Sequence, residues 1–185
     1  MLKVLIGASV VVAVGAFAIY WMTSMPGNPV PTEPAGVLPD EAELADELRS
    51  IVEHLAVRIG PRSMQRPEQL ERARRYLAAR LTEQGYEIRE LAYGISGAQA
   101  PAVNIEARRS EAKGQLLLVG AHYDSVGDHC PGANDNASGV AALIALAKRL
   151  RDISARTPIR FVAFTNEEPP FFQTPLQGSV RYVDA

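Results

Sequence analysis

Two short apolar runs with an apolar segment between them restrict the fold of this chain more than any other feature. The first run covers residues 115–121, with Gly114 and Gly120 at its limits, and the second covers 159–164. Continuous apolar runs of this length predict strands that are buried on both faces, so we expect the first to be a central strand. The segment 138–150 is apolar nearly all round and predicts a buried helix. This strand, helix, strand order implies a right-handed crossover and a largely parallel centre to the sheet.

Two amphipathic helices and two more strands are predicted before this core. Residues 40–59 and 67–85 show helical periodicity, 87–93 alternate loosely as in a half-buried edge strand, and 102–107 resemble a short strand. The expected inward-facing positions are Leu44, Leu48, Ile51, Leu55 and Ile59 on the first helix, and Leu70, Ala73, Leu77 and Leu81 on the second. The arginines expected to form a solvated face of the second helix are Arg72, Arg74, Arg75 and Arg80.

Length and charge exclude several classes of protein. The 185 residues are enough for one domain with a hydrophobic core, and the formal net charge is only −2. The chain has no basic stripe interleaved with aromatic residues, so we expect no nucleic-acid partner. Cys130 is the single cysteine, which rules out a disulfide within the chain. The functional argument therefore depends on specific sites.

The N-terminal segment predicts a membrane anchor. Residues 4–22 carry no charge and, as a helix, would be about 28 Å long, close to the thickness of a bilayer core. Lys3 precedes this segment, and the next basic residue is Arg49. The positive-inside rule then predicts a transmembrane anchor at 1–22, with the rest of the chain on the periplasmic or extracellular side.

The competing interpretation of this segment is a cleaved signal peptide, with a small-residue site at Ala16-Phe17-Ala18 and secretion of the remainder. The apolar run continues to Met22, which favours the anchor. Residues 23–39 are rich in proline and glycine and predict a semi-rigid linker. The folded domain is then expected over 40–185.

Polar residues follow both apolar strands, where ligands bind in sheets of this kind. His122 and Asp124 come after the first strand, and Glu167 and Glu168 come after the second. Asp135 lies in a glycine-rich turn before the helix. Imidazole and carboxylate ligands suit zinc, with manganese or cobalt as substitutes.

Each of these motifs, considered alone, could also have a purely structural role. His122 could be a structural histidine, and Asp135 could cap the helix, although Asn136 would do that as well. Glu167 and Glu168 could form an exposed acidic turn. Their joint placement at one edge of the predicted sheet favours a metal centre, with a glutamate as general base.

Three segments together resemble the M28 family of metallopeptidases, the co-catalytic zinc aminopeptidases. They are Gly120-Ala-His-Tyr-Asp-Ser125, Gly132-Ala-Asn-Asp-Asn-Ala-Ser-Gly139 and Phe161-Val-Ala-Phe-Thr-Asn-Glu-Glu-Pro-Pro170. The resemblance extends over about 43–185 and includes Arg58-Ile-Gly-Pro-Arg62. It implies a three-layer α/β/α sandwich with a mixed sheet, and hydrolysis of the N-terminal peptide bond of a peptide.

The resemblance also implies a role for each residue of the site. His122 would bind one zinc ion, Glu168 would bind a second, and Asp135 would bridge the two. Glu167 would be the general base that activates the water, and Asp124 would orient the imidazole of His122.

The family needs five metal ligands, and this sequence offers three. An aspartate and a histidine would be expected beyond residue 185, and His54, His129 and Asp184 are poorly placed to replace them. We therefore expect an incomplete sandwich that belongs to a longer protein and that is inactive or weakly active by itself.

Two rival functions remain. A non-catalytic domain could bind peptides or partners in the same cleft, but it would have no use for both Glu167 and Glu168. A single-zinc aminoacyl transferase of the glutaminyl cyclase kind is the other rival. His122 argues against it, because the resemblance implies that such enzymes lack this ligand.

Overall fold

The computed structural model describes residues 2–24, 39–109, 115–154 and 158–185, with side chains described for 12–24, 40–109, 115–152 and 158–185. The chain divides into two units, Met1–Val37 and Leu38–Ala185. The first unit contains helix α1, Leu2–Thr23, over the segment that is predicted to be helical. The predicted linker lies almost wholly outside the described residues.

The membrane prediction gains no support from α1. Within the part of the chain that the structure describes, no helix combines the length and the hydropathy that a membrane span requires. The transmembrane anchor at 1–22 therefore stays a prediction.

The second unit is built on a four-stranded mixed sheet, in the order β1-β2-β4-β3. Its strands are β1 (Glu87–Tyr93), β2 (Ala102–Arg108), β3 (Leu117–His122) and β4 (Ile159–Phe164). The β1–β2 and β2–β4 pairs are antiparallel, and only β3 and β4 are parallel. The expectation of a mixed sheet is confirmed, but that of a largely parallel one is wrong. A parallel pair needs a long crossover, which here is supplied only between β3 and β4.

Strand β3 is an edge strand of the described sheet, whereas we predicted a central one. It pairs only with β4, and Leu116, Leu117 and Leu118 are 43%, 52% and 40% exposed. The run of leucines indicates a strand that can be buried on both faces, but it does not determine how many neighbours that strand has. Strand β4 takes the central place, between β2 and β3.

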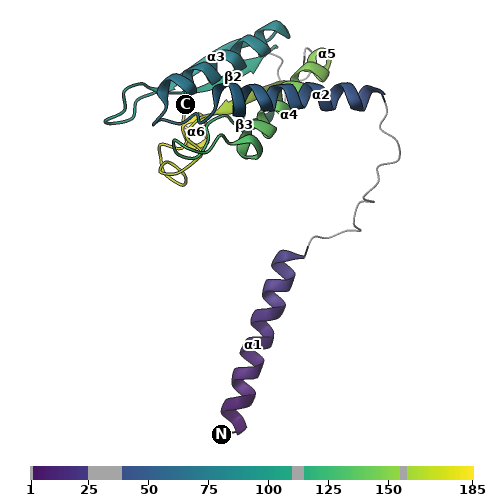
Figure 1. The fold of residues 1–185 in the computed structure, drawn as a ribbon, viewed down its shortest axis with the longest axis vertical. Coiled ribbons are helices and arrows are strands. Elements are labelled where there is room, and N and C mark those ends of the chain that lie inside the picture. The colour runs from purple at the N-terminus through teal and green to yellow at the C-terminus, as the bar shows by residue number, and fades with distance from the viewer. Residues whose placement is uncertain (1, 25–38, 110–114, 155–157) are drawn as a thin grey trace. The chain divides into compact units, whose positions relative to one another are not determined.

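The helices form layers on both faces of the sheet (Figure 1). Helices α2 (Pro39–Glu53), α3 (Pro67–Glu83) and α4 (Ser138–Arg149) pack together on one face, where α3 contacts β1 and β2 and α4 contacts β3 and β4. On the other face, α6 (Gly178–Val183) contacts β2. The π-helical turn η1 (His54–Ile59), the kinked turn η2 (Ala133–Ala137), which is not helical at Asp135 and Asn136, and the short helix α5 (Arg151–Ser154) complete the unit. These layers agree with the predicted α/β/α sandwich.

The predicted inner faces of the helices form the core. The buried members are Ile51, Leu55, Ile59, Leu70, Ala73, Leu77 and Leu81, while Leu44 and Leu48 are half-buried. The arginine face of α3 is less solvated than predicted. Only 18% of the Arg74 side chain is exposed, because it forms ion pairs with Glu71 and Glu90. Tertiary pairing with β1 explains this difference.

Candidate metal centre

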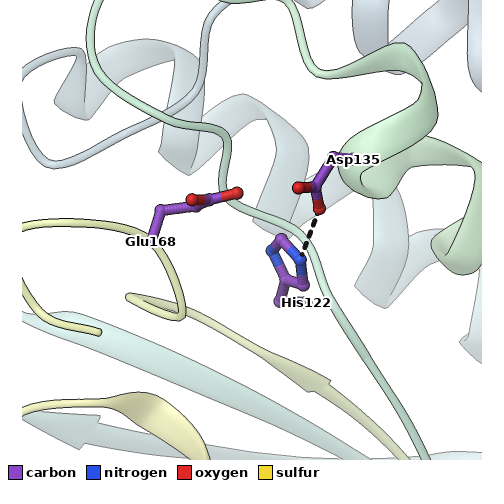
Figure 2. Close-up of side chains that lie close together, drawn as sticks. All are labelled: His122, Asp135 and Glu168. Carbon is purple, nitrogen blue, oxygen red and sulfur yellow. Dashed lines mark hydrogen bonds and ion pairs between the residues drawn. The ribbon is translucent and has the colours of Figure 1, made fainter. Parts of the chain in front are cut away.

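Three of the predicted site residues converge at the end of the parallel strand pair. His122, Asp135 and Glu168 each offer one ligand atom, and these atoms all lie within 4.8 Å of one another. Figure 2 shows the three side chains pointing toward one another from three different segments. The His122 Nε2 atom lies 3.0 Å from Asp135 Oδ1. Among the residues that the structure describes, this is the one group of His, Cys, Asp and Glu with such a spacing.

The strand register explains how distant residues meet here. His122 is the last residue of β3 and is paired with Phe164, the last residue of β4. The chain leaves β4 through Asn166, whose φ of 58° lies in the left-handed region that asparagine tolerates better than most residues. Glu168 therefore follows the end of one strand and faces the histidine at the end of its neighbour.

Asp124 links the two strand ends. Its carboxylate is buried, and its two oxygens accept the backbone N–H groups of Glu167 and Glu168, each at 3.3 Å. The Oδ1 atom also lies 3.4 Å from Nδ1 of His122, although without the alignment of a hydrogen bond. Asp124 thus fixes the Glu167–Glu168 backbone and provides a negative charge beside the imidazole.

Helix capping does not occupy Asp135. The Oδ1 atom of Asn136 accepts the backbone N–H of Gly139 at 3.0 Å, which caps the first turn of α4. The side chain of Asp135 is 71% exposed and faces His122 instead. Asn136 therefore caps the helix in place of Asp135, and the Asp135 carboxylate is available to bind a ligand.

The charges of the cluster favour an added positive charge. Burial raises the pKa of Glu168, and the neighbouring Asp135 carboxylate raises it further. For His122, burial lowers the pKa, but the Asp124, Asp135 and Glu168 carboxylates together outweigh it and raise the pKa above its ordinary value. A dication relieves the same repulsion that these protons relieve. The donor types and their charges therefore fit zinc.

The Glu167 carboxylate is held by residues at the start of α6. Its Oε1 accepts the backbone N–H of Ser179 at 2.6 Å, and its Oε2 accepts the Ser179 hydroxyl at 3.0 Å and the amide of Gln177. It nevertheless lines one open pocket of about 440 Å³ with His122, Asp135, Glu168, Pro169 and Phe172. Ser179 and Gln177 could not be predicted as its partners, because nothing local to Glu167 indicates partners at that separation.

The residues that we set aside as ligands lie apart from the centre. His54 stacks on Tyr76, with ring centroids 4.0 Å apart. The side chain of His129 is 89% exposed and pairs with Asp128. Neither residue belongs to the metal-ligand group, and neither does Asp184.

Comparison with known proteins identifies related sequences. Residues 103–185 match the sequence model of peptidase family M28. The chain is 32% identical over 166 residues to the uncharacterized protein YfbL of Escherichia coli, covering 86% of this chain and 47% of that protein. It is 44% identical over 69 residues to aminopeptidase YwaD of Bacillus subtilis, covering 37% of this chain and 14% of that protein. The chain therefore spans less than half the length of these relatives.

Solved structures show the same fold. A Zn-dependent exopeptidase from Parabacteroides distasonis is similar with a TM-score of 0.57 and 25% identity, over 66% of this chain and 47% of that one. A glutaminyl cyclase from Porphyromonas gingivalis is similar with a TM-score of 0.57 and 30% identity, over 66% of this chain and 45% of that one. The similarity thus includes proteins that carry two different activities.

Proposed function

This chain is a member of peptidase family M28 over residues 103–185, and on that premise we propose that it carries part of the centre of a zinc-dependent aminopeptidase. The observation that carries the proposal is the convergence of His122, Asp135 and Glu168, with ligand atoms within 4.8 Å of one another. The names of YwaD and of the Parabacteroides exopeptidase support a peptidase that uses zinc. The substrate would be the N-terminal peptide bond of a peptide.

We further propose two zinc ions, with His122 on one, Glu168 on the other and Asp135 between them. Bound zinc supplies Lewis-acid chemistry, which polarises a carbonyl group and makes water a better nucleophile near neutral pH. This chain's own contribution is to hold the ions and to orient His122 through Asp124, which lies 3.4 Å from the imidazole Nδ1.

Glu167 is our candidate for the general base. An ionised carboxylate offers about four acceptor positions, two on each oxygen. Ser179 and Gln177 use both positions on Oε2 and one on Oε1. The remaining position on Oε1 can take a proton from water, while the other three bonds hold the carboxylate still. Its place in the pocket beside the three ligands supports this role.

Glutaminyl cyclase activity is a second candidate, because cyclases of several organisms share the fold. A peptide-binding domain without catalysis is a third. The three candidates give different products: a free N-terminal amino acid, a pyroglutamyl peptide, or an unchanged bound peptide. Mass spectrometry after incubation with peptides that begin with leucine or with glutamine distinguishes them.

The first test is a zinc titration of the purified chain, followed by competition with a chromophoric chelator. We expect wild type to bind zinc and Asp135→Asn to bind it far more weakly. His129→Asn, which changes an exposed histidine outside the centre, should bind like wild type. Failure of the folded wild-type chain to bind zinc would refute the proposal. Turnover of an aminoacyl-p-nitroanilide is expected to be slow at best with the three ligands present in this chain.

A further inference from the structure

Arg62 is a fully buried arginine that lies before the residues 103–185 matched to the family model, in the motif Arg58-Ile-Gly-Pro-Arg62. It follows η1, and its side chain is 0% exposed. The Nε atom donates to the carbonyl oxygen of Tyr123 at 2.7 Å, and Nη2 donates to that of Gly132 at 2.9 Å. The Nη1 atom donates to the carbonyl oxygens of Pro131 and Gly60. One guanidinium thus holds both ends of the segment 123–132.

The backbone of Arg62 holds the same segment. Its N–H donates to the hydroxyl of Ser125 at 3.1 Å, and its carbonyl accepts the N–H of Ser125 at 2.9 Å. The Ser125 hydroxyl in turn donates to the carbonyl oxygen of Cys130 at 2.9 Å. The segment 123–132 is therefore tied to Arg62 at its start, and Ser125 ties that start to its end.

The segment 123–132 separates two of the candidate ligands. His122 comes immediately before it, and Asp135 comes three residues after it. Gly132 has a φ of 55°, and a Cβ atom there would lie 2.7 Å from Ser125 Cβ and 3.3 Å from Arg62 Nη2. The segment is thus packed directly against the guanidinium at the point where it turns toward Asp135.

Burying an arginine costs desolvation free energy, so stabilising the fold alone gives little reason for Arg62 to be buried. Replacing buried charges by apolar groups of similar volume is often neutral or stabilising. Burial lowers the pKa of Arg62 to about 10, although the nearby Asp124 carboxylate raises it, so the group stays charged at neutral pH. A charged planar fork with several donors can hold several carbonyl oxygens in one fixed arrangement, which an apolar side chain cannot do.

We propose that Arg62 is a positioning residue that fixes the segment 123–132 and thereby sets Asp135 opposite His122. The part that concerns zinc rests on the proposed function, whereas the anchoring of the segment does not. Arg62 touches neither substrate nor metal ligands in this role. It acts through the backbone between them.

The first experiment measures amide hydrogen exchange without zinc in wild type and in Arg62→Lys. Lysine keeps the charge but lacks the fork, so the amides of Ser125 and Ala137 should exchange about tenfold faster, while those of α3 stay unchanged. Arg80→Lys is the matched control, because Arg80 forms ion pairs with Glu47 and Glu83 away from the segment. Unchanged exchange of Ser125 and Ala137 in Arg62→Lys would overturn the proposal.

The second experiment measures zinc affinity well below the melting temperature. Arg62→Lys should bind zinc about 10–100-fold more weakly, as is typical when a residue that supports metal ligands is lost. Arg80→Lys should remain within about twofold of wild type. Millimolar guanidinium chloride, far below denaturing concentrations, should partly restore binding to Arg62→Ala, and sodium chloride should not. Faster exchange with unchanged zinc affinity would overturn the positioning role.

Two further outcomes are separable. If wild type binds no zinc, the proposed function fails, and the exchange data still decide whether Arg62 anchors the segment. If the Arg62 variants do not fold, Ser125→Ala removes only the hydroxyl contacts with the Arg62 N–H and the Cys130 carbonyl oxygen. It should show the same two effects in weaker form, and wild-type behaviour of Ser125→Ala would count against the proposal.

Discussion

Asp124 connects the two strand ends at the candidate centre. A buried carboxylate is costly unless it is hydrogen-bonded. Asp124 meets that requirement with the N–H groups of Glu167 and Glu168, and it lies 3.4 Å from the imidazole of His122. One side chain therefore couples the orientation of one ligand to the position of another.

We predict that Asp124→Asn weakens zinc binding by about 10–100-fold. The amide would offer one acceptor oxygen where the carboxylate offers two, and its NH₂ group would oppose a backbone N–H. The free energy of unfolding should also fall by about 1–3 kcal/mol because a buried donor is left without an acceptor. Chelator competition and chemical denaturation measure the two effects. Asp128→Asn, on a partly exposed residue that pairs with His129, serves as the control and should change neither quantity.

The raised pKa values of His122 and Glu168 predict opposite effects of pH with and without zinc. Both groups must lose a proton to bind the metal, so zinc affinity should rise with pH. Without zinc, a raised pKa in the folded state contributes stability below the unfolded value, and this contribution is lost as pH rises through the folded value. The increase in melting temperature caused by zinc should therefore grow from about pH 6 to about pH 8.

Differential scanning calorimetry with and without zinc checks this dependence on pH. His122→Gln should remove most of it, and His129→Gln should keep it, because His129 lies in an exposed pair away from the centre. A zinc-induced shift of constant size across this range in wild type would contradict the assignment of His122 as a ligand.

The side chains of the site were predictable to different extents. His122, Asp135 and Glu168 could be predicted because parallel strands place their carboxyl ends at one edge of a sheet. The partners of Glu167 could not, since Ser179 and Gln177 reach it only through the docking of α6. Arg62 lies in the motif Arg58-Ile-Gly-Pro-Arg62. Its role could not be predicted, because it depends on backbone carbonyl groups, which a pattern of side chains does not reveal.

At the scale of elements, the turn before α4 decides where Asp135 lies. Gly132 adopts a left-handed conformation, and a Cβ atom there would lie 2.4 Å from the carbonyl oxygen of Asp135. Gly127, in the same segment, also has a positive φ, but a Cβ atom there would meet nothing within 4 Å. A side chain at position 127 would therefore add backbone strain alone, whereas one at position 132 would add backbone strain and a steric clash.

We predict that Gly132→Ala lowers the free energy of unfolding by at least about 3 kcal/mol and displaces Asp135, with a loss of zinc affinity. Gly127→Ala should cost only about 1–2 kcal/mol, the usual penalty for a left-handed alanine, and should keep zinc affinity. Denaturant titration of both variants gives the comparison. Equal losses of stability, with zinc binding intact in both, would show that the close contact at Gly132 is relieved without moving Asp135.

The types of the elements followed from local sequence, and their arrangement did not. Helical periodicity identified the inner faces of α2 and α3, because burial of one stripe repeats along the chain. The run of leucines in β3 indicated a central strand, but β4 occupies the central place. Strand order depends on pairings between distant segments, which apolar runs do not encode.

For the folded unit as a whole, the strand order places the site and an apolar edge on the same element. Strand β3 ends at His122 and, in the described sheet, has β4 as its single neighbour. Leu117 and Leu118 are 52% and 40% exposed on that edge. An exposed apolar edge strand offers unpaired backbone groups to another chain and is a site of self-association.

We predict that Leu118→Glu reduces self-association of the chain and leaves its fold intact. Leu118 is paired with Arg160 in the β3–β4 register, so a glutamate there gains an opposite charge across the strands and places a charge on the edge. Static light scattering at equal concentrations measures the effect, and circular dichroism checks the fold. Leu146→Glu, at a leucine of α4 that is 42% exposed, is the control for a general gain in charge. If both variants reduce scattering equally, added charge explains the result and the β3 edge has no special part in association.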